Sequence, residues 1–128
     1  MPLVPFDLMG GYQFWREGCL FMATFACEVL RQAGEKVTME NIVKIVESLP
    51  NNQDDFLPES KWVKQSYLSA CLKSAFERDT SDEKEKVKGF VDNLLIYFVK
   101  RSWLARETLV DSFVGILKGV EAGMKLDE

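Results

Sequence analysis

Histidine is absent from this chain of 128 residues, and cysteine is scarce, with three residues. Without histidine the commonest general base and metal ligand is lost, together with every Ser–His or Cys–His pair. Cys19, Cys27 and Cys71 are odd in number, and the first two lie in the most apolar segment. They are typical of small buried hydrophobes in a reducing compartment. These absences argue against an enzyme.

An excess of positive charge is also missing. The chain has 16 basic and 20 acidic residues, a formal net charge of −4, whereas proteins that coat nucleic acids are strongly basic. It has no uncharged apolar run of the ~20 residues that a membrane span needs, and no basic residue before an apolar leader. Walker, dinucleotide-binding and zinc motifs are absent too. We therefore expect a cytoplasmic protein without a cofactor or metal.

The most prominent feature present is a long apolar segment, FWREGCLFMATFACEVLRQA, at residues 14–33. Its apolar residues cover most of a helical circumference. The polar residues form one narrow stripe, which consists of Gln13, Glu17, Thr24, Glu28 and Arg31. This pattern predicts a central helix from Tyr12 to Ala33, ended by Gly34, with neighbours on several sides.

Four further segments have helical periodicity, and none has the alternation of a strand. They are a helix capped by Thr38 and ended before Pro50, one from Pro58 through Phe76, one opened by the capping box Thr80–Glu83, and one from Ala105 to Ala122 after a break at 102–104. The predicted fold is all-α, a compact bundle of about five helices around a buried first helix. Residues 1–11 are expected to be an extended lead-in, 12–123 the helical domain and 124–128 a frayed tail.

Five basic residues are the candidate contacts for a partner protein or DNA: Lys84, Lys86, Lys88, Lys100 and Arg101. Acidic residues alternate with the first three, so an ordinary solvated helix face is the competing interpretation.

Two acidic residues of the first helix, Glu17 and Glu28, allow a second hypothesis. If they are buried, Arg16 or Arg31 could pair with them structurally, or the two carboxylates could form an acid–base site.

Two stretches, LMGGYQFWREG at 8–18 and GEKVTMENI at 34–42, together resemble the helical insertion of type IV secretion coupling proteins. The order continues with Tyr97-Phe98, followed by Leu104, Thr108 and Ser112, so the resemblance spans most of the chain. Leu109 is a departure, since family members often have arginine there.

The resemblance implies the all-alpha domain of a hexameric, membrane-anchored ATPase that feeds DNA–relaxase complexes or effector proteins into conjugation-type channels. The domain would recognise a secretion substrate, relaxosome or adaptor protein by contact, and the isolated domain would be a monomer. As an insertion, it would have its two ends close together. The missing nucleotide-binding motifs are expected for such a segment.

Two alternatives stay open. A free-standing helical adaptor or secretion chaperone would be a dimer with an exposed hydrophobic patch. A DNA-binding role would require a local basic patch, because the overall charge does not favour it.

Overall fold

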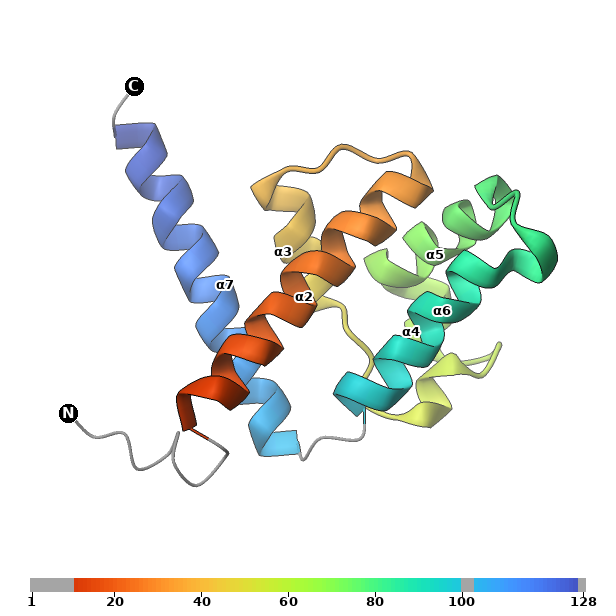
Figure 1. Ribbon diagram of the computed structural model, residues 1–128, viewed down its shortest axis with the longest axis horizontal. Helices are drawn as coiled ribbons and strands as arrows, with labels where there is room; N and C mark the ends of the chain where they lie inside the picture. The colour runs from red at the N-terminus through yellow and green to blue at the C-terminus, as the bar shows by residue number, and fades with distance from the viewer. Residues whose placement is uncertain (1–10, 100–102, 127–128) are drawn as a thin grey trace.

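The computed structural model describes residues 11–99 and 103–126, and within these ranges it contains α-helices and no strand. Six α-helices follow one another: α2 (Gly11–Ala33), α3 (Met39–Glu47), α4 (Lys61–Gln65), α5 (Tyr67–Arg78), α6 (Glu85–Leu94) and α7 (Trp103–Leu126) (Figure 1). Short 3-10 turns occur at η1 (Gln53–Phe56) and η2 (Asp82–Lys84), and a π-helical turn, η3 (Leu95–Val99), extends α6. The prediction of an all-α bundle is confirmed.

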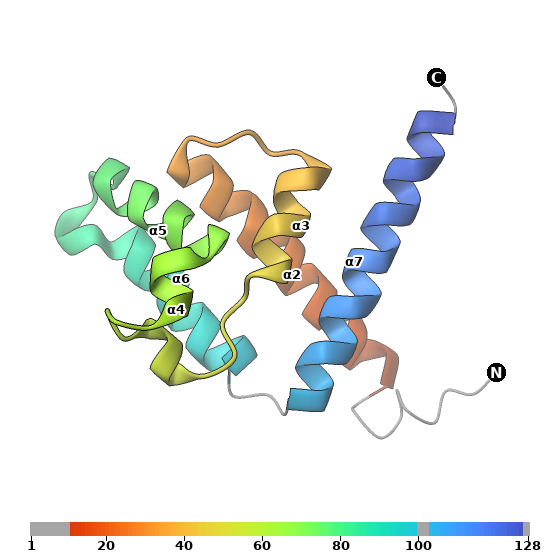
Figure 2. The same cartoon turned by 180° about the vertical axis from the view of Figure 1, so that it is seen from behind.

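Helix α2 is central, because α3, α5 and α7 all pack against it (Figures 1 and 2). Its buried face includes Met22, Phe25, Val29 and Leu30, none of which is more than 4% exposed. Burial of each such side chain stabilises the fold by roughly 1.5–3 kcal/mol. The polar stripe on the other side of α2 is exposed, so the helix is covered on part of its circumference and open on the rest.

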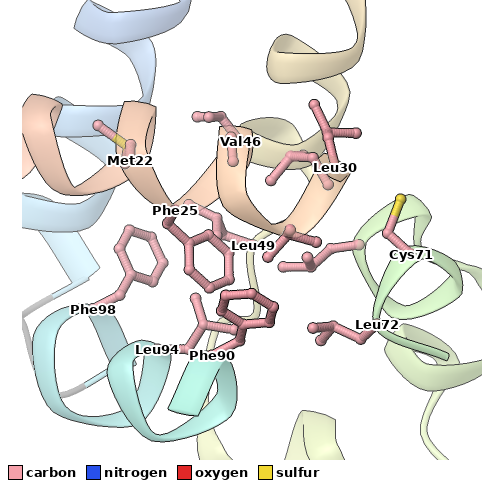
Figure 3. Close-up of a cluster of buried hydrophobic side chains, with 14 of the residues drawn as sticks. Met22, Phe25, Leu30, Val46, Leu49, Cys71, Leu72, Phe90, Leu94 and Phe98 are labelled. Carbon is pink, nitrogen blue, oxygen red and sulfur yellow. The ribbon is translucent and has the colours of Figure 1, made fainter. Parts of the chain in front are cut away.

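The core continues from α2 into every other α-helix except α4. Phe25 of α2 meets Phe90 of α6 edge to face, with ring centroids 6.0 Å apart, and Leu94 and Phe98 lie beside them (Figure 3). The buried residues of the remaining helices include Val46 of α3, Leu68, Cys71 and Leu72 of α5, and Leu109, Phe113 and Val114 of α7.

The turn from α2 to α3 forms as predicted. Gly34 has a φ of +80°, and the N–H groups of Gly34 and Glu35 donate to the carbonyls of Arg31 and Leu30 at 3.1 and 2.9 Å. This is the Schellman arrangement, which favours glycine because of the positive φ. Thr38 then caps α3, with its hydroxyl accepting from the Asn41 N–H at 3.1 Å.

The single helix predicted from Pro58 through Phe76 is wrong, because it is divided at Ser66. Ser66 has extended backbone angles, ends α4 and caps α5 by accepting from the Ser69 N–H at 3.0 Å. Apolar spacing is the same on both sides of this junction, so periodicity alone did not reveal the break. A serine inside a helical pattern competes with the helix for backbone hydrogen bonds, and here it ends one helix and begins the next.

The capping box predicted at Thr80–Glu83 does not open the next helix. The buried carboxylate of Asp79 instead accepts hydrogen bonds from the Ser81 N–H at 2.9 Å, the Ser81 hydroxyl at 2.5 Å and the Val87 N–H at 3.2 Å. Lys84 adopts the left-handed conformation, φ 60°, directly before α6. The chain therefore turns around Asp79, and α6 begins five residues after Thr80.

Helix α7 is longer than predicted. It begins at Trp103, inside the expected break, and it continues through Gly123 to Leu126, so the predicted stop at Gly123 is wrong. The start of α2 lies beside the first half of α7, whereas the second half of α7 meets α3 through Leu117 and Lys118 and then projects, so that its end extends away from the rest of the molecule (Figures 1 and 2). The start of α2 and the end of α7 are thus far apart, contrary to the expectation for an insertion. The predicted lead-in at 1–11 and the last two residues of the tail lie outside the described residues, apart from Gly11.

A candidate docking groove along α2

Among the predicted basic contacts, the three that the structure describes, Lys84, Lys86 and Lys88, do not form one patch. Lys84, on the connection before α6, donates from its ammonium to the Asp79 carbonyl at 2.8 Å and stands 5.1 Å from the centroid of the Phe76 ring. It therefore stabilises the turn between α5 and α6. Lys86 and Lys88 are exposed, but two residues along a helix place them about 200° apart around the axis. Lys100 and Arg101 lie outside the described residues.

The two acidic residues of α2 are exposed, which removes the hypothesis of a buried carboxylate pair. The Glu17 carboxylate accepts from the Gln13 side chain at 3.0 Å, one helical turn away. Glu28 is also exposed. The predicted ion pairs with Arg16 or Arg31 are therefore not needed to stabilise buried charges, and both carboxylates are available on the surface.

Three hollows follow one another along the exposed side of α2, neighbouring ones share lining residues, and we call the three together the α2 groove. The first, about 420 Å³, shares Glu17 and Leu20 with the middle one, which is about 400 Å³. The middle one shares Glu28 with the third, about 390 Å³. The residues of α2 that line the groove are Gln13, Arg16, Glu17, Leu20, Phe21, Thr24, Phe25, Glu28, Arg31 and Gln32. The opposite wall comes from α6, with Lys86, Phe90 and Asn93.

The middle hollow is apolar. Leu20 is 62% exposed, the most exposed of the large hydrophobic residues in the described part of the chain. Beside it, the rings of Phe21 and Phe25 are stacked at 5.5 Å between centroids. Phe25 belongs to the core, whereas Phe21 is half-buried, so the floor of the hollow is an extension of the core that reaches the surface. Apolar surface of this kind, rimmed by polar groups, is typical of an interaction site.

Charges of opposite sign alternate along the groove. Arg16 lies at one end, Glu17 and Glu28 flank the apolar middle, and Arg31 with Lys86 lies at the other end. The α2 groove therefore offers an apolar hollow between two carboxylates, with cations beyond each of them. Such an arrangement can select the charge pattern of a partner.

Leu20 is the signal in the sequence that could have identified this groove. It lies on the polar stripe of α2, three residues after Glu17 and four before Thr24. An apolar residue at that place in a polar stripe has no core to enter. The α6 wall gives no such signal, because it comes from a helix whose position depends on the tertiary fold.

A second cleft, between α3 and α7, is a weaker candidate. It has a volume of about 570 Å³ and an apolar floor that includes Met39, Val43 and Leu117. Its rim charges pair with one another: Lys44 with Glu40 at 3.5 Å and Lys118 with Glu47 at 3.8 Å. Since these pairs satisfy one another on the surface, the cleft presents little unmatched charge to a partner.

The thiols give no sign of chemistry. All three cysteines are free, and Cys71 is buried while Cys19 and Cys27 are half-buried. Burial raises the pKa of the Cys19 and Cys71 thiols, which favours the neutral form, the poorer nucleophile. Burial also raises the pKa of Tyr67 to about 12, with a hydrogen bond to Cys71 adding to the effect. Cys71 belongs to the hydrophobic core, and Cys19 and Tyr67 pack against it.

Within residues 11–99 and 103–126, no group of three or more Cys, Asp or Glu side chains is placed to hold a metal ion. Among the helices described, none combines the length and the apolar character required to cross a membrane. Comparisons of the chain with protein-family models, with curated proteins and with solved structures find no match.

Proposed function

We propose that this chain is a recognition domain that works by contact with another protein and carries no catalytic centre of its own. The observation that supports the proposal is the α2 groove, where the core reaches the surface at Leu20 and Phe21 between unburied carboxylates. Hydrophobic surface costs solubility and stability unless something covers it, so an apolar hollow on a well-packed domain favours a binding role.

The parent protein in this proposal is a type IV secretion coupling ATPase, hexameric and membrane-anchored, with the domain on its cytoplasmic side. The domain would meet the secretion substrate, a relaxosome protein or an adaptor. Its contacts could individually be weak, because six copies in one assembly raise the effective affinity. A cytoplasmic location follows from the same assignment.

The motif residues behind this assignment have identifiable structural roles in the turn between α2 and α3. Gly34 supplies the positive φ, Thr38 caps α3, and the Asn41 amide donates to the Lys36 carbonyl at 2.9 Å. The GEKVTMENI residues thus stabilise the fold of the domain. The partner would be selected by other residues, on the surface. The distance between Gly11 and Leu126 requires that a host domain be reached from two separate points of the bundle.

A transfer assay tests the proposal directly. The variant Leu20→Asp, introduced into the full gene that encodes this chain, should lower conjugative transfer or effector secretion by about tenfold or more, since a charge in the hollow excludes an apolar partner. Leu57→Asp is the matched control, because Leu57 is 50% exposed and lies outside the groove. Unchanged transfer with Leu20→Asp, or a gene without a nucleotide-binding ATPase around this segment, would contradict the proposal.

A free-standing helical adaptor or secretion chaperone is the second candidate. The projecting half of α7 favours it, since Ile116 and Val120 there are 47% and 46% exposed. A dimer that covers this face would sediment at twice 14.7 kDa, whereas the recognition domain is expected as a monomer. DNA contact is separable by salt: phosphate binding predicts a steep loss of affinity with ionic strength, and protein contact through the apolar hollow does not.

A further inference from the structure

We infer that the α2 groove accepts an amphipathic helix that carries a bulky apolar side chain at its centre, basic side chains on either side of it and acidic side chains at its ends. This inference rests on the proposed function, which it deepens by giving the chemistry of the partner. It is argued from the length, shape and charge order of the groove.

The groove has the length of a helix of about five turns. Its lining runs along α2 from Gln13 to Gln32, and 19 helical rises of 1.5 Å give about 28 Å. Along the middle and third hollows one wall is the side of α2 and the other is the side of α6, so this part of the groove lies between two helices, whereas the residues that line the first hollow all belong to α2. A third helix fits such a groove by placing its side-chain ridge between them.

This surface is less suited to binding an extended peptide. Peptides that add a strand need a sheet edge with unpaired N–H and C=O groups, and residues 11–99 and 103–126 contain no strand. The backbone groups in the middle of α2 and α6 are occupied by their own helical hydrogen bonds. The backbone N–H and C=O groups of a helical partner bond to one another within the helix, so it contacts the groove through side chains alone. The groove likewise offers only side chains for contact.

The carboxylates set the position of the basic residues. Glu17 and Glu28 are 11 residues apart, which is about 16 Å along the axis and within about 20° of the same direction around it. Leu20 lies between them, next to the hollow over Phe21. A partner helix therefore needs two Lys or Arg residues about 11 positions apart on one face, with a Leu, Ile, Met or Phe between them.

The cations at the ends set the acidic residues. Arg16 lies beyond Glu17, and Arg31 with Lys86 lies beyond Glu28. A helix that is basic along its whole length would meet like charges at both ends of the groove. The order of charges therefore selects against a uniformly basic peptide, because such a peptide would place like charges together at both ends.

The test uses a synthetic helical peptide of about 18 residues as the probe, because that length matches the groove. It carries leucine at the centre, lysines 11 positions apart on the same face and glutamate at each end, and alanine elsewhere for helix propensity. Fluorescence anisotropy measures its affinity for the whole chain. A second peptide of the same composition, with lysine and glutamate exchanged, measures the selection of charge order.

The double variant Glu17→Lys/Glu28→Lys should weaken binding of the first peptide by about tenfold or more and should largely remove the preference between the two peptides, because Arg16, Arg31 and Lys86 still repel the end lysines of the exchanged peptide. Glu59→Lys/Glu77→Lys is the matched control, with the same change of net charge at two exposed glutamates outside the groove. Two results would overturn the inference. One is an equal effect of the two double variants on peptide binding, and the other is an equal affinity of the wild-type chain for the two peptides. Leu20 is exposed, so Leu20→Asp should remain folded and should also lose about tenfold in affinity.

A second copy of the chain is the other occupant that the experiment detects. If the chain sediments as a dimer that Leu20→Asp dissociates, the groove is covered by another copy and the inference is wrong. The transfer assay is independent: charge-selective peptide binding with unchanged transfer would refute the proposed function and leave the inference standing, whereas reduced transfer without peptide selectivity would do the reverse.

Discussion

At the scale of single residues, Asp79 shows how one buried carboxylate holds a junction between helices. Its side chain is 2% exposed and accepts from two backbone N–H groups and the Ser81 hydroxyl. These hydrogen bonds lower the pKa of Asp79 below its usual value of 3.8, and the bond from the Ser81 hydroxyl has the largest effect. They stabilise the ionised form in the folded state and fix where α6 begins.

The lowered pKa of Asp79 predicts a pH dependence of stability. A carboxyl whose pKa is lower in the folded than in the unfolded state stabilises the fold fully above its unfolded pKa. That contribution is lost as the pH falls through the lower, folded pKa. We expect the loss below about pH 4. In Asp79→Asn this part of the pH dependence should vanish and the urea midpoint at pH 7 should fall.

Urea unfolding of wild type and Asp79→Asn from pH 7 to pH 2.5 or so measures this effect. Asp92→Asn is the control, since it removes an exposed carboxylate from α6, the helix that follows the Asp79 turn. If the difference in unfolding free energy between wild type and Asp79→Asn stays constant as the pH falls, the carboxylate does not act through its ionised form.

Two neighbouring phenylalanines should differ in their contribution to stability. Phe25→Ala removes a ring that is 4% exposed and packed against Phe90, so it should cost about 3–5 kcal/mol. Phe21 is half-buried on the wall of the groove, and Phe21→Ala should cost only about 1–2 kcal/mol. Chemical unfolding measures both, and equal costs would show that the groove floor is as well packed as the core.

At the scale of the helices, the closest approach between α2 and α7 is made at a glycine. A Cβ atom on Gly18 would lie 2.6 and 2.8 Å from the Cδ atoms of Leu109, which is itself 1% exposed. Gly18→Ala should therefore destabilise the fold by about 1–3 kcal/mol, because Leu109 has little room to move. Gly119, in the projecting half of α7, has nothing within 4 Å of such a Cβ.

Gly119→Ala is the matched substitution, and it should stabilise the protein by about 0.5–1 kcal/mol through helix propensity alone. The opposite signs of the two Gly→Ala effects, measured in the same denaturant series, test the placement of α7. If Gly119→Ala were destabilising, another surface would have to cover that face of the helix in solution.

Elements set by local chemistry were predictable from the sequence, and those set by tertiary contacts were not. The Schellman turn at Gly34 and the cap at Thr38 depend on the residues beside them, and both form as predicted. The break at Ser66 is stabilised from a distance, because the Ser48 hydroxyl accepts from the Leu68 N–H at 3.1 Å. No pattern within residues 58–76 contains that information.

The same distinction explains the candidate site. The polar stripe of α2 was predicted from the sequence, but whether it is buried was left open, and in the structure it lies on the face that points away from the core. That the stripe borders a groove depends on where α6 lies, and this position follows from the packing of Phe90 and Leu94 against Phe25. The lysines at 84–88 were predicted as contacts because of their charge alone. In the structure Lys84 has a left-handed backbone conformation, and its ammonium donates to the Asp79 carbonyl.

At the scale of the whole molecule, packing is unevenly distributed. The interior of the bundle is continuous from α2 through α3, α5 and α6 to the first half of α7. The second half of α7 extends beyond it (Figure 2). The exposed residues there are Gly115, Ile116, Lys118, Gly119, Val120, Ala122 and Gly123. Three glycines in nine residues disfavour a helix, and isolated helical segments of this length are marginal in water.

Hydrogen exchange should therefore separate the two halves of α7 and rank the helices. Amides of α2 between Met22 and Leu30 should exchange only through global unfolding, because their side chains form the centre of the core. Amides from Gly119 onward should exchange orders of magnitude faster, since most residues there are exposed and local opening exposes little new apolar surface. A partner or second copy that binds the projecting half would slow exchange there, in proportion to the concentration of the binding species. Uniform, concentration-independent protection along α7 would contradict this distribution of stability, and would mean that the distal half packs against the bundle.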